Sequence, residues 1–234
     1  HQRETFVCVD KDGNPLRPAM LWLDSRAVEE VEKYGSQKVH ELTGKPVNLT
    51  PAWYKLLWLQ KHEPETLQRT FKIVDVQAFI VNKLTGDWIT SYGSADPMGV
   101  INMKTFDYSD ELLELAKLKR EQFPRLAAPG DVIGQISDSI AEELGLPKGL
   151  PVVASLGDGQ SAQLGTGAIS PGSYYLNLGS GVVSGTISDK YEFDKAFRVL
   201  AAGIPGEYTF ETFIGDRKST RLNSSHLGIS YAVF

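Results

Sequence analysis

The stretch PVVASLGDGQ, residues 151–160, says most about the fold class of this 234-residue chain. Its first half, residues 151–155, is an apolar, β-branched run that predicts a buried strand. A glycine-flanked acid, Asp158, follows, and small residues predict a helix over residues 161–164. In α/β proteins ligands bind beyond the carboxyl ends of strands, so the stretch predicts a ligand-facing acid at the rim of a sheet.

Asp158 has two interpretations on the sequence alone. A carboxylate in this place can accept the proton of a substrate hydroxyl during phosphoryl transfer. Gly157 and Gly159 would then let a substrate approach the backbone closely. The same acid could instead only cap the helix that follows it. The residues themselves leave both interpretations open.

A second glycine-rich turn lies in NLGSGVVSG, residues 177–185, between two predicted strands. The turn formed by Gly179, Ser180 and Gly181 could direct backbone N–H groups at a phosphate. An ordinary hairpin has the same pattern. The turn is not a Walker loop, because no Gly-Lys-Ser/Thr sequence follows it.

Polar and aromatic residues near the start of the chain are candidate sugar contacts. Arg3 and Glu4 offer a donor and an acceptor that can bind neighbouring hydroxyls of a polyol, although a solvated ion pair is the simpler alternative. Trp22 could stack on the apolar face of a sugar or pack in the core. Asp24 and Arg26, which follow it, could form an ion pair.

The rest of the chain alternates predicted strands and helices and then becomes strand-rich. We expect strands over 5–9 and 19–23, paired as a hairpin, and over 71–74 and 131–136. Helices are expected from residue 25 and over 53–62, 76–84, 110–118 and 137–144. Strand-like runs follow over 174–178, 182–187 and 208–213. This change predicts a first domain over residues 1–169 and the start of a second over 170–215.

Composition excludes several classes of function. The net charge of -5 is spread along the chain without a Lys/Arg cluster, so we expect no nucleic-acid partner. No apolar stretch is long enough to span a bilayer, so we expect no membrane partner. The single cysteine, Cys8, lies in an apolar run, which indicates an inert strand residue. One unpaired cysteine suits a reducing cytoplasm, where we expect this protein to act on a small molecule.

Both ends of the sequence have unusual features. Residues 216–226, DRKSTRLNSSH, and residues 229–234, ISYAVF, match the in-frame translation of a common sequencing-library adapter. We therefore expect residues 216–234 to be a non-native tail with no part in fold or function. The chain begins with His1 rather than methionine, and we expect the natural start to lie upstream.

Taken together, these pieces resemble the FGGY family of carbohydrate kinases. QRET, residues 2–5, and LRPAMLWLDSR, residues 16–26, look like the family's first sugar-contact strand and its Trp-x-Asp-x-Arg hairpin. LTGDWITSYGSA, residues 84–95, is similar to another family segment, and GDGQ, residues 157–160, to its catalytic-aspartate motif. LGSG, residues 178–181, resembles the second phosphate loop with one residue fewer. The order and spacing hold from His1 to about Gly215.

The resemblance implies an α/β protein with the actin-like (ribonuclease H-like) kinase fold, here an incomplete first domain and the start of the second. It implies transfer of the γ-phosphoryl group of ATP, with Mg²⁺, to a sugar hydroxyl, and it places no metal ligand in this chain. By position, Asp158 would be the general base. The sugar contacts would be Arg3, Glu4, Trp22 and Gln160, and the phosphate contacts would be Gly179, Ser180 and Gly181.

The resemblance narrows the substrate only in part. KLLWLQKHEPE, residues 55–65, and the general layout look most like xylulokinases, whereas Arg3 and Glu4 are similar to the pair found in glycerol kinases. D-xylulose is therefore the first substrate expected. The alternatives are glycerol, another polyol or pentulose, or a non-catalytic sugar-binding role. The whole enzyme could be a homodimer.

The resemblance also bears on what residues 1–234 do by themselves. The family's opening phosphate-binding strand and its adenine-binding part have no counterpart here. We therefore expect no kinase activity from this chain alone. We also expect it to expose sheet edges, which favour aggregation.

Overall fold

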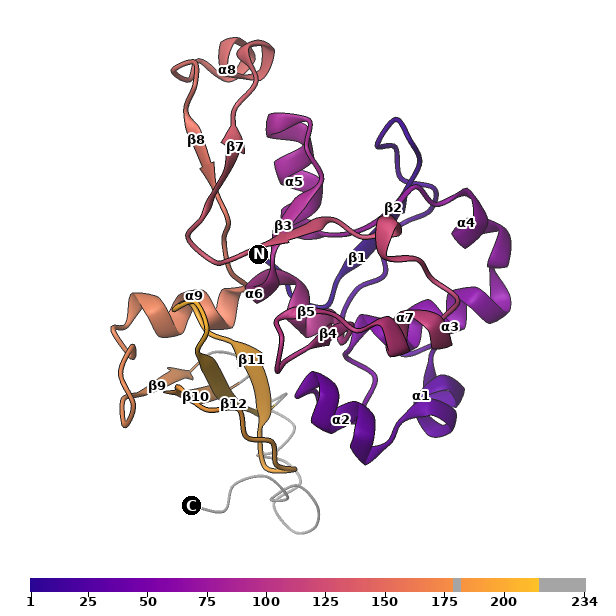
Figure 1. Ribbon diagram of the computed structural model, residues 1–234, viewed down its shortest axis with the longest axis vertical. Helices are drawn as coiled ribbons and strands as arrows, with labels where there is room; N and C mark the ends of the chain where they lie inside the picture. Colours follow the sequence, from indigo (N-terminus) through magenta and orange to yellow (C-terminus); the bar gives the residue numbers. More distant parts are fainter. Residues whose placement is uncertain (179–181, 215–234) are drawn as a thin grey trace.

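The computed structural model describes residues 1–178 and 182–214 (Figure 1). The helices in these ranges are α1 Val28–Tyr34, α2 Gln37–Thr43, α3 Ala52–His62, α4 Pro64–Arg69, α5 Val76–Thr85, α6 Tyr92–Ala95, α7 Asp110–Leu115, α8 Asp138–Leu144 and α9 Asp158–Gly165. The strands are β1 Phe6–Val9, β2 Lys72–Asp75, β3 Ile89–Ser91, β4 Ile101–Asn102, β5 Asp107–Tyr108, β6 Arg125–Ala127, β7 Val132–Gln135, β8 Pro151–Val153, β9 Tyr174–Leu178, β10 Val182–Ser188, β11 Arg198–Ala201 and β12 Tyr208–Ile214. Two short 3₁₀ turns cover Asp96–Met98 and Arg120–Gln122.

The largest sheet of the described residues has four antiparallel strands in the order β11-β12-β10-β9. It lies beside α9 in the lower part of Figure 1. The other strands form pairs, among them the antiparallel pair β1-β2 and the parallel pair β3-β6. Helix α9 packs against β9 and β10 of this sheet, and its second residue, Gly159, lies next to Glu211 of β12.

The core is built around α3. This helix begins after Pro51 and buries seven of its eleven residues, including Trp53 and Tyr54 at 1% and 2% exposure. The indole N–H of Trp53 donates a hydrogen bond to the Leu112 carbonyl at 3.0 Å. Both aromatic side chains therefore pack in the core, and neither lines the cavity described below.

Strand β11 is joined to the first part of the chain by a buried polar contact. The ammonium of Lys45 lies 3.2 Å from Asp96, and both side chains are almost fully buried. The backbone N–H of Ala201 donates to the same carboxylate at 2.8 Å. Val199 and Ala201 belong to one hydrophobic cluster with α3. The domain boundary at residue 170 stays a prediction, and the core contains side chains from both sides of it.

Two predicted strands differ from the structure. Residues 19–23 form no strand, and the expected hairpin is reduced to isolated bridges at Met20 and Pro15. The strand predicted over residues 151–155 is present as β8, Pro151–Val153, but the prediction that it is buried is wrong. β8 pairs with β7 in a ribbon that projects with α8 at the top of Figure 1, and Val153 is 48% exposed. β-Branched residues favour an extended backbone, but burial depends on what packs against the strand.

Other expectations from the sequence agree with the structure. Cys8 is fully buried in β1, and burial raises the pKa of its thiol to about 11, so it is unreactive at neutral pH. Within residues 1–178 and 182–214, none of the helices has the length and apolar character needed to cross a bilayer. The predicted tail, residues 216–234, lies outside the described residues.

Candidate active site

Asp158 is the first residue of α9, five residues beyond the end of β8. The N-cap of this helix is Gly157, so Asp158 does not have the capping role that the sequence left open. Its side chain is 67% exposed. The carboxylate oxygen Oδ1 lies 3.1 Å from the Arg3 Nε and accepts a hydrogen bond from the Gly159 N–H at 2.9 Å. These two contacts fix the direction of an otherwise accessible carboxylate.

Asp158 shares a cavity of about 310 Å³ with three of the predicted sugar contacts, Arg3, Glu4 and Trp22. The other lining residues are Gln2, Thr50, Val183, Arg198 and Phe213. Residues separated by more than 150 positions in the sequence therefore face the same space. The cavity contains guanidinium donors, carboxylate acceptors and aromatic rings, which is the combination that binds a hydroxylated ligand.

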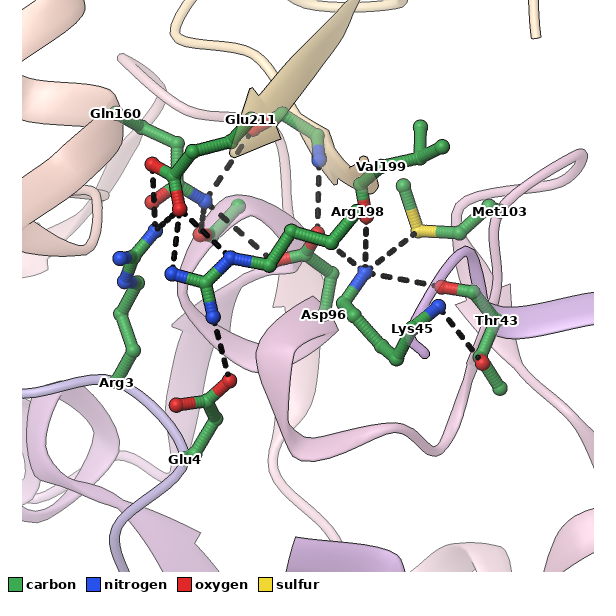
Figure 2. Close-up of polar contacts among 12 residues, drawn as sticks. Arg3, Glu4, Thr43, Lys45, Asp96, Met103, Gln160, Arg198, Val199 and Glu211 are labelled. Carbon is green, nitrogen blue, oxygen red and sulfur yellow. Dashed lines mark hydrogen bonds and ion pairs between the residues drawn. The ribbon is translucent and has the colours of Figure 1, made fainter. Parts of the chain in front are cut away.

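Arg3 lies across the start of α9. Besides Asp158, it contacts Glu211 of β12, with its Nη1 at 3.1 Å from each carboxylate oxygen (Figure 2). Burial opposes the charge on Arg3, but the Glu211 carboxylate outweighs this effect and raises the pKa of the guanidinium. Arg3 is therefore charged at all relevant pH values and is held at both ends.

The glycines that flank Asp158 make room for Arg3. A Cβ on Gly157 would lie 2.5 Å from the Arg3 Cγ, and one on Gly159 would lie 2.7 Å from its Nη1. We expected these glycines to admit a substrate. In the structure the Arg3 side chain lies beside both glycines, and at Gly159 the Glu211 carboxylate is closer still, with its Oε2 at 2.6 Å from the position of a Cβ. Any larger residue would displace these groups.

Glu4 follows Arg3 with its backbone in the left-handed region, at φ 61°. Non-glycine residues are uncommon there, and such strained residues cluster at functional sites. The Glu4 carboxylate is 5% exposed and lies 3.1 Å from the Arg198 Nη1. The backbone conformation thus directs Arg3 and Glu4, neighbours in sequence, to separate partners on the wall of one cavity.

Trp22 lines the cavity from a loop whose backbone is held by Lys55. Its ring packs edge to face against Phe213 of β12, with centroids 6.3 Å apart. The buried ammonium of Lys55 donates hydrogen bonds to the Trp22 and Thr50 carbonyls at 3.4 and 2.8 Å. Burial lowers the pKa of Lys55 to about 8, although Glu4 favours its charged form. One lysine therefore holds two segments that line the cavity.

Two groups of predicted site residues lie elsewhere. Gln160 is a fully buried residue of α9 whose Nε2 donates to the Gly93 carbonyl at 2.9 Å, and it does not line the cavity. Its role as a sugar contact stays a prediction. The predicted phosphate turn, Gly179, Ser180 and Gly181, lies outside the described residues.

Sequence reasoning missed two residues of the site, Arg198 and Glu211. Arg198 Nε lies 2.7 Å from Glu211, and the Tyr175 hydroxyl donates to the other Glu211 oxygen at 2.6 Å. Burial opposes ionisation of Glu211, but Arg198 and Arg3 reverse this effect and lower its pKa. An acid inside the strand-like run YTFETFI, residues 208–214, was the available signal. Arg198 carried no signal, because its partners are distant in sequence.

Among residues 1–178 and 182–214, no three His, Cys, Asp or Glu side chains are grouped so that they could hold a metal ion. Asp158 is a single carboxylate, and its Oδ1 is already held by Arg3. The described residues therefore do not fit a complete Mg²⁺ site of their own.

Solved structures show the class of fold to which this geometry belongs. A ligand-bound xylulose kinase from Lactobacillus acidophilus superimposes with a TM-score of 0.85 and 27% identity, over 90% of this chain and 44% of that one. The chain thus has the actin-like fold of carbohydrate kinases, and the predicted fold class is confirmed.

Sequence comparison then identifies the family. Residues 1–165 match the FGGY family of carbohydrate kinases, N-terminal domain, so this chain belongs to that family. It is 34% identical to a xylulose kinase of Streptomyces rubiginosus over 80% of this chain and 38% of that protein. It is 30% identical to a glycerol kinase of Thermococcus kodakarensis over 90% of this chain and 43% of that protein. The chain thus spans less than half the length of these relatives.

Proposed function

We propose that this protein is an ATP-dependent carbohydrate kinase that transfers the γ-phosphoryl group to a hydroxyl of a ketose or polyol. The observation that supports this most is that the exposed carboxylate of Asp158 faces one cavity with Arg3, Glu4 and Trp22. Membership of the FGGY family supports the reaction class. D-xylulose is the first substrate proposed, since a xylulose kinase is among the relatives, and glycerol is the alternative.

The proposed mechanism uses the cavity residues in separate roles. Arg3 donates to one substrate hydroxyl and Glu4 accepts from a neighbouring one, while the Trp22 ring covers an apolar part of the sugar. These contacts bring the reacting hydroxyl to Asp158. Because Arg3 and the Gly159 N–H hold Oδ1, the carboxylate is aimed before the substrate arrives. Asp158 then accepts the hydroxyl proton as the phosphoryl group is transferred.

ATP supplies the phosphoryl group, and we propose that Gly179, Ser180 and Gly181 approach its phosphates. That turn lies outside the described residues. Mg²⁺ is expected with ATP, but the described residues do not fit a complete site for it, so no step is assigned to the ion here. In this chain the contribution of the protein is to position the sugar and to accept a proton.

The test is Asp158→Asn in the full-length gene product that carries this sequence, assayed for ATP-dependent phosphorylation of D-xylulose and glycerol. Loss of a general base lowers turnover by about 10²–10⁴-fold. Sugar affinity should change only a few-fold, because Arg3, Glu4 and Trp22 remain. Near-normal turnover in the variant would contradict the role of Asp158.

The matched control is Asp138→Asn. Asp138 is the first residue of α8, as Asp158 is of α9, and it is similarly exposed, but it lies on the projecting ribbon away from the cavity. Its replacement removes the same charge from the same position of a helix. We expect turnover to be unchanged in this variant.

A further inference from the structure

An alternating chain of charges runs along the cavity. It passes from Glu4 to Arg198, from Arg198 to Glu211, from Glu211 to Arg3 and from Arg3 to Asp158, and its four links join neighbours of opposite sign (Figure 2 shows the first three). The inner member, Glu211, is fully buried, and the two arginine side chains are only 10% and 13% exposed. Both guanidinium groups are thus matched on each side by a carboxylate.

This charge balance has a consequence for the ligand. Two guanidinium groups face three carboxylates, and the buried ammonium of Lys55 interacts with Glu4, so every positive charge in this cluster is already matched by a carboxylate. A sugar that carries a carboxylate would meet Glu4 and Asp158 with no unmatched guanidinium to receive it. An uncharged polyol needs only the hydrogen bonds that Arg3, Glu4 and Asp158 can still make. The cavity therefore favours neutral ligands over sugar acids.

We propose that Glu211 is a positioning residue that holds Arg3 and Arg198 and cancels their charge, so that the site selects uncharged ketoses and polyols over sugar acids. This inference rests on the proposed function and makes its substrate class narrower. Glu211 acts through the two arginines, because its own carboxylate is enclosed by Arg3, Arg198 and Tyr175. It explains why an acid is buried in the middle of β12.

A second cavity of about 280 Å³ adjoins the first and shares Glu4, Thr50, Arg198 and Phe213 with it. Its lining includes the exposed residue Lys195. This lysine is the competing explanation for any binding of a sugar acid, because a long substrate could pass from Asp158 towards it. The experiment must therefore separate Lys195 from Glu211.

Binding to the 234-residue chain tests the inference, measured by titration calorimetry with D-xylulose, glycerol and D-gluconate at one ionic strength. The wild type should bind gluconate at least about tenfold more weakly than the better neutral ligand. Glu211→Gln leaves both arginines short of a carboxylate, so the ratio of the two affinities should move towards gluconate by about tenfold or more. Loss of structure would instead weaken the binding of both ligands and would not shift the ratio of their affinities towards gluconate.

Three further variants complete the design, and one of them, Lys195→Met, removes the competing cation of the second cavity. Glu4→Gln also releases Arg198 and should move the ratio in the same direction, so it replaces Glu211→Gln if circular dichroism shows that variant to be unfolded. The charge-matched control is Glu41→Gln, which breaks a surface pair with Lys104 and should leave the ratio unchanged.

The outcomes separate the two proposals. An unchanged ratio in the folded variants overturns the inference, as does a wild type that prefers gluconate. Gluconate binding that disappears in Lys195→Met also overturns it, because the second cavity would then set the selectivity. In all these cases the kinase proposal stands. Failure of the folded wild type to bind any of the three ligands would count against the proposed function itself.

Discussion

Replacing Gly159 by alanine tests the arrangement at the start of α9 without any assumption about function. The new Cβ would lie 2.6 Å from the Glu211 Oε2 and 2.7 Å from the Arg3 Nη1. Both distances are below van der Waals contact, and Glu211 is fully buried and cannot move aside freely. Overpacking of this kind costs about 1–3 kcal/mol. Against it stands a gain of about 1 kcal/mol at most, because alanine favours a helix over glycine.

We therefore expect Gly159→Ala to lower the free energy of unfolding by about 1–2 kcal/mol, or more if the Arg3–Glu211 contact is broken. Gly165→Ala is the matched control, since Gly165 ends the same helix and a Cβ there would meet nothing within 4 Å. That variant should be neutral or slightly stabilised. Urea unfolding of the 234-residue chain measures both. A Gly159→Ala variant at least as stable as Gly165→Ala would refute the packing described here.

Two further predictions concern buried lysines. Lys45→Met should lower the free energy of unfolding by about 3–5 kcal/mol, because it leaves the Asp96 carboxylate buried without its cation. The double variant Lys45→Met, Asp96→Asn should lose less stability than the sum of the two single variants, as measured by urea unfolding. Lys55 has a pKa of about 8 in the folded chain, whereas its ordinary value of 10.5 applies in the unfolded chain. Between these two pH values the unfolded chain binds more protons than the folded chain. The free energy of unfolding therefore rises with pH over that range. Urea unfolding from pH 7 to 10 should show this rise, up to about 3 kcal/mol, in the wild type and not in Lys55→Met; equal slopes would contradict the shifted pKa.

Local patterns in the sequence were sufficient to predict most individual elements. The helices α3, α5 and α8 and the strands β9, β10 and β12 lie within a few residues of their predicted positions. The motif around Asp158 led to a helix, predicted over residues 161–164 and found over Asp158–Gly165, and to the cavity. Arg3, Glu4 and Trp22 were selected because the family resemblance implied that all three bind the sugar. Periodicity and turn chemistry are local properties, so one sequence can reveal them.

The sequence by itself thus determined where most helices and strands form and that Asp158 is an accessible acid at the start of a helix. Only the tertiary structure decided that β8 is exposed, that Gln160 is turned into the interior and that Arg3 occupies the space beside the two glycines. It also decided the partners of Arg198 and Glu211. These outcomes depend on contacts between residues as far apart as Arg3 and Glu211, and such contacts leave no periodic or spacing signal along the chain.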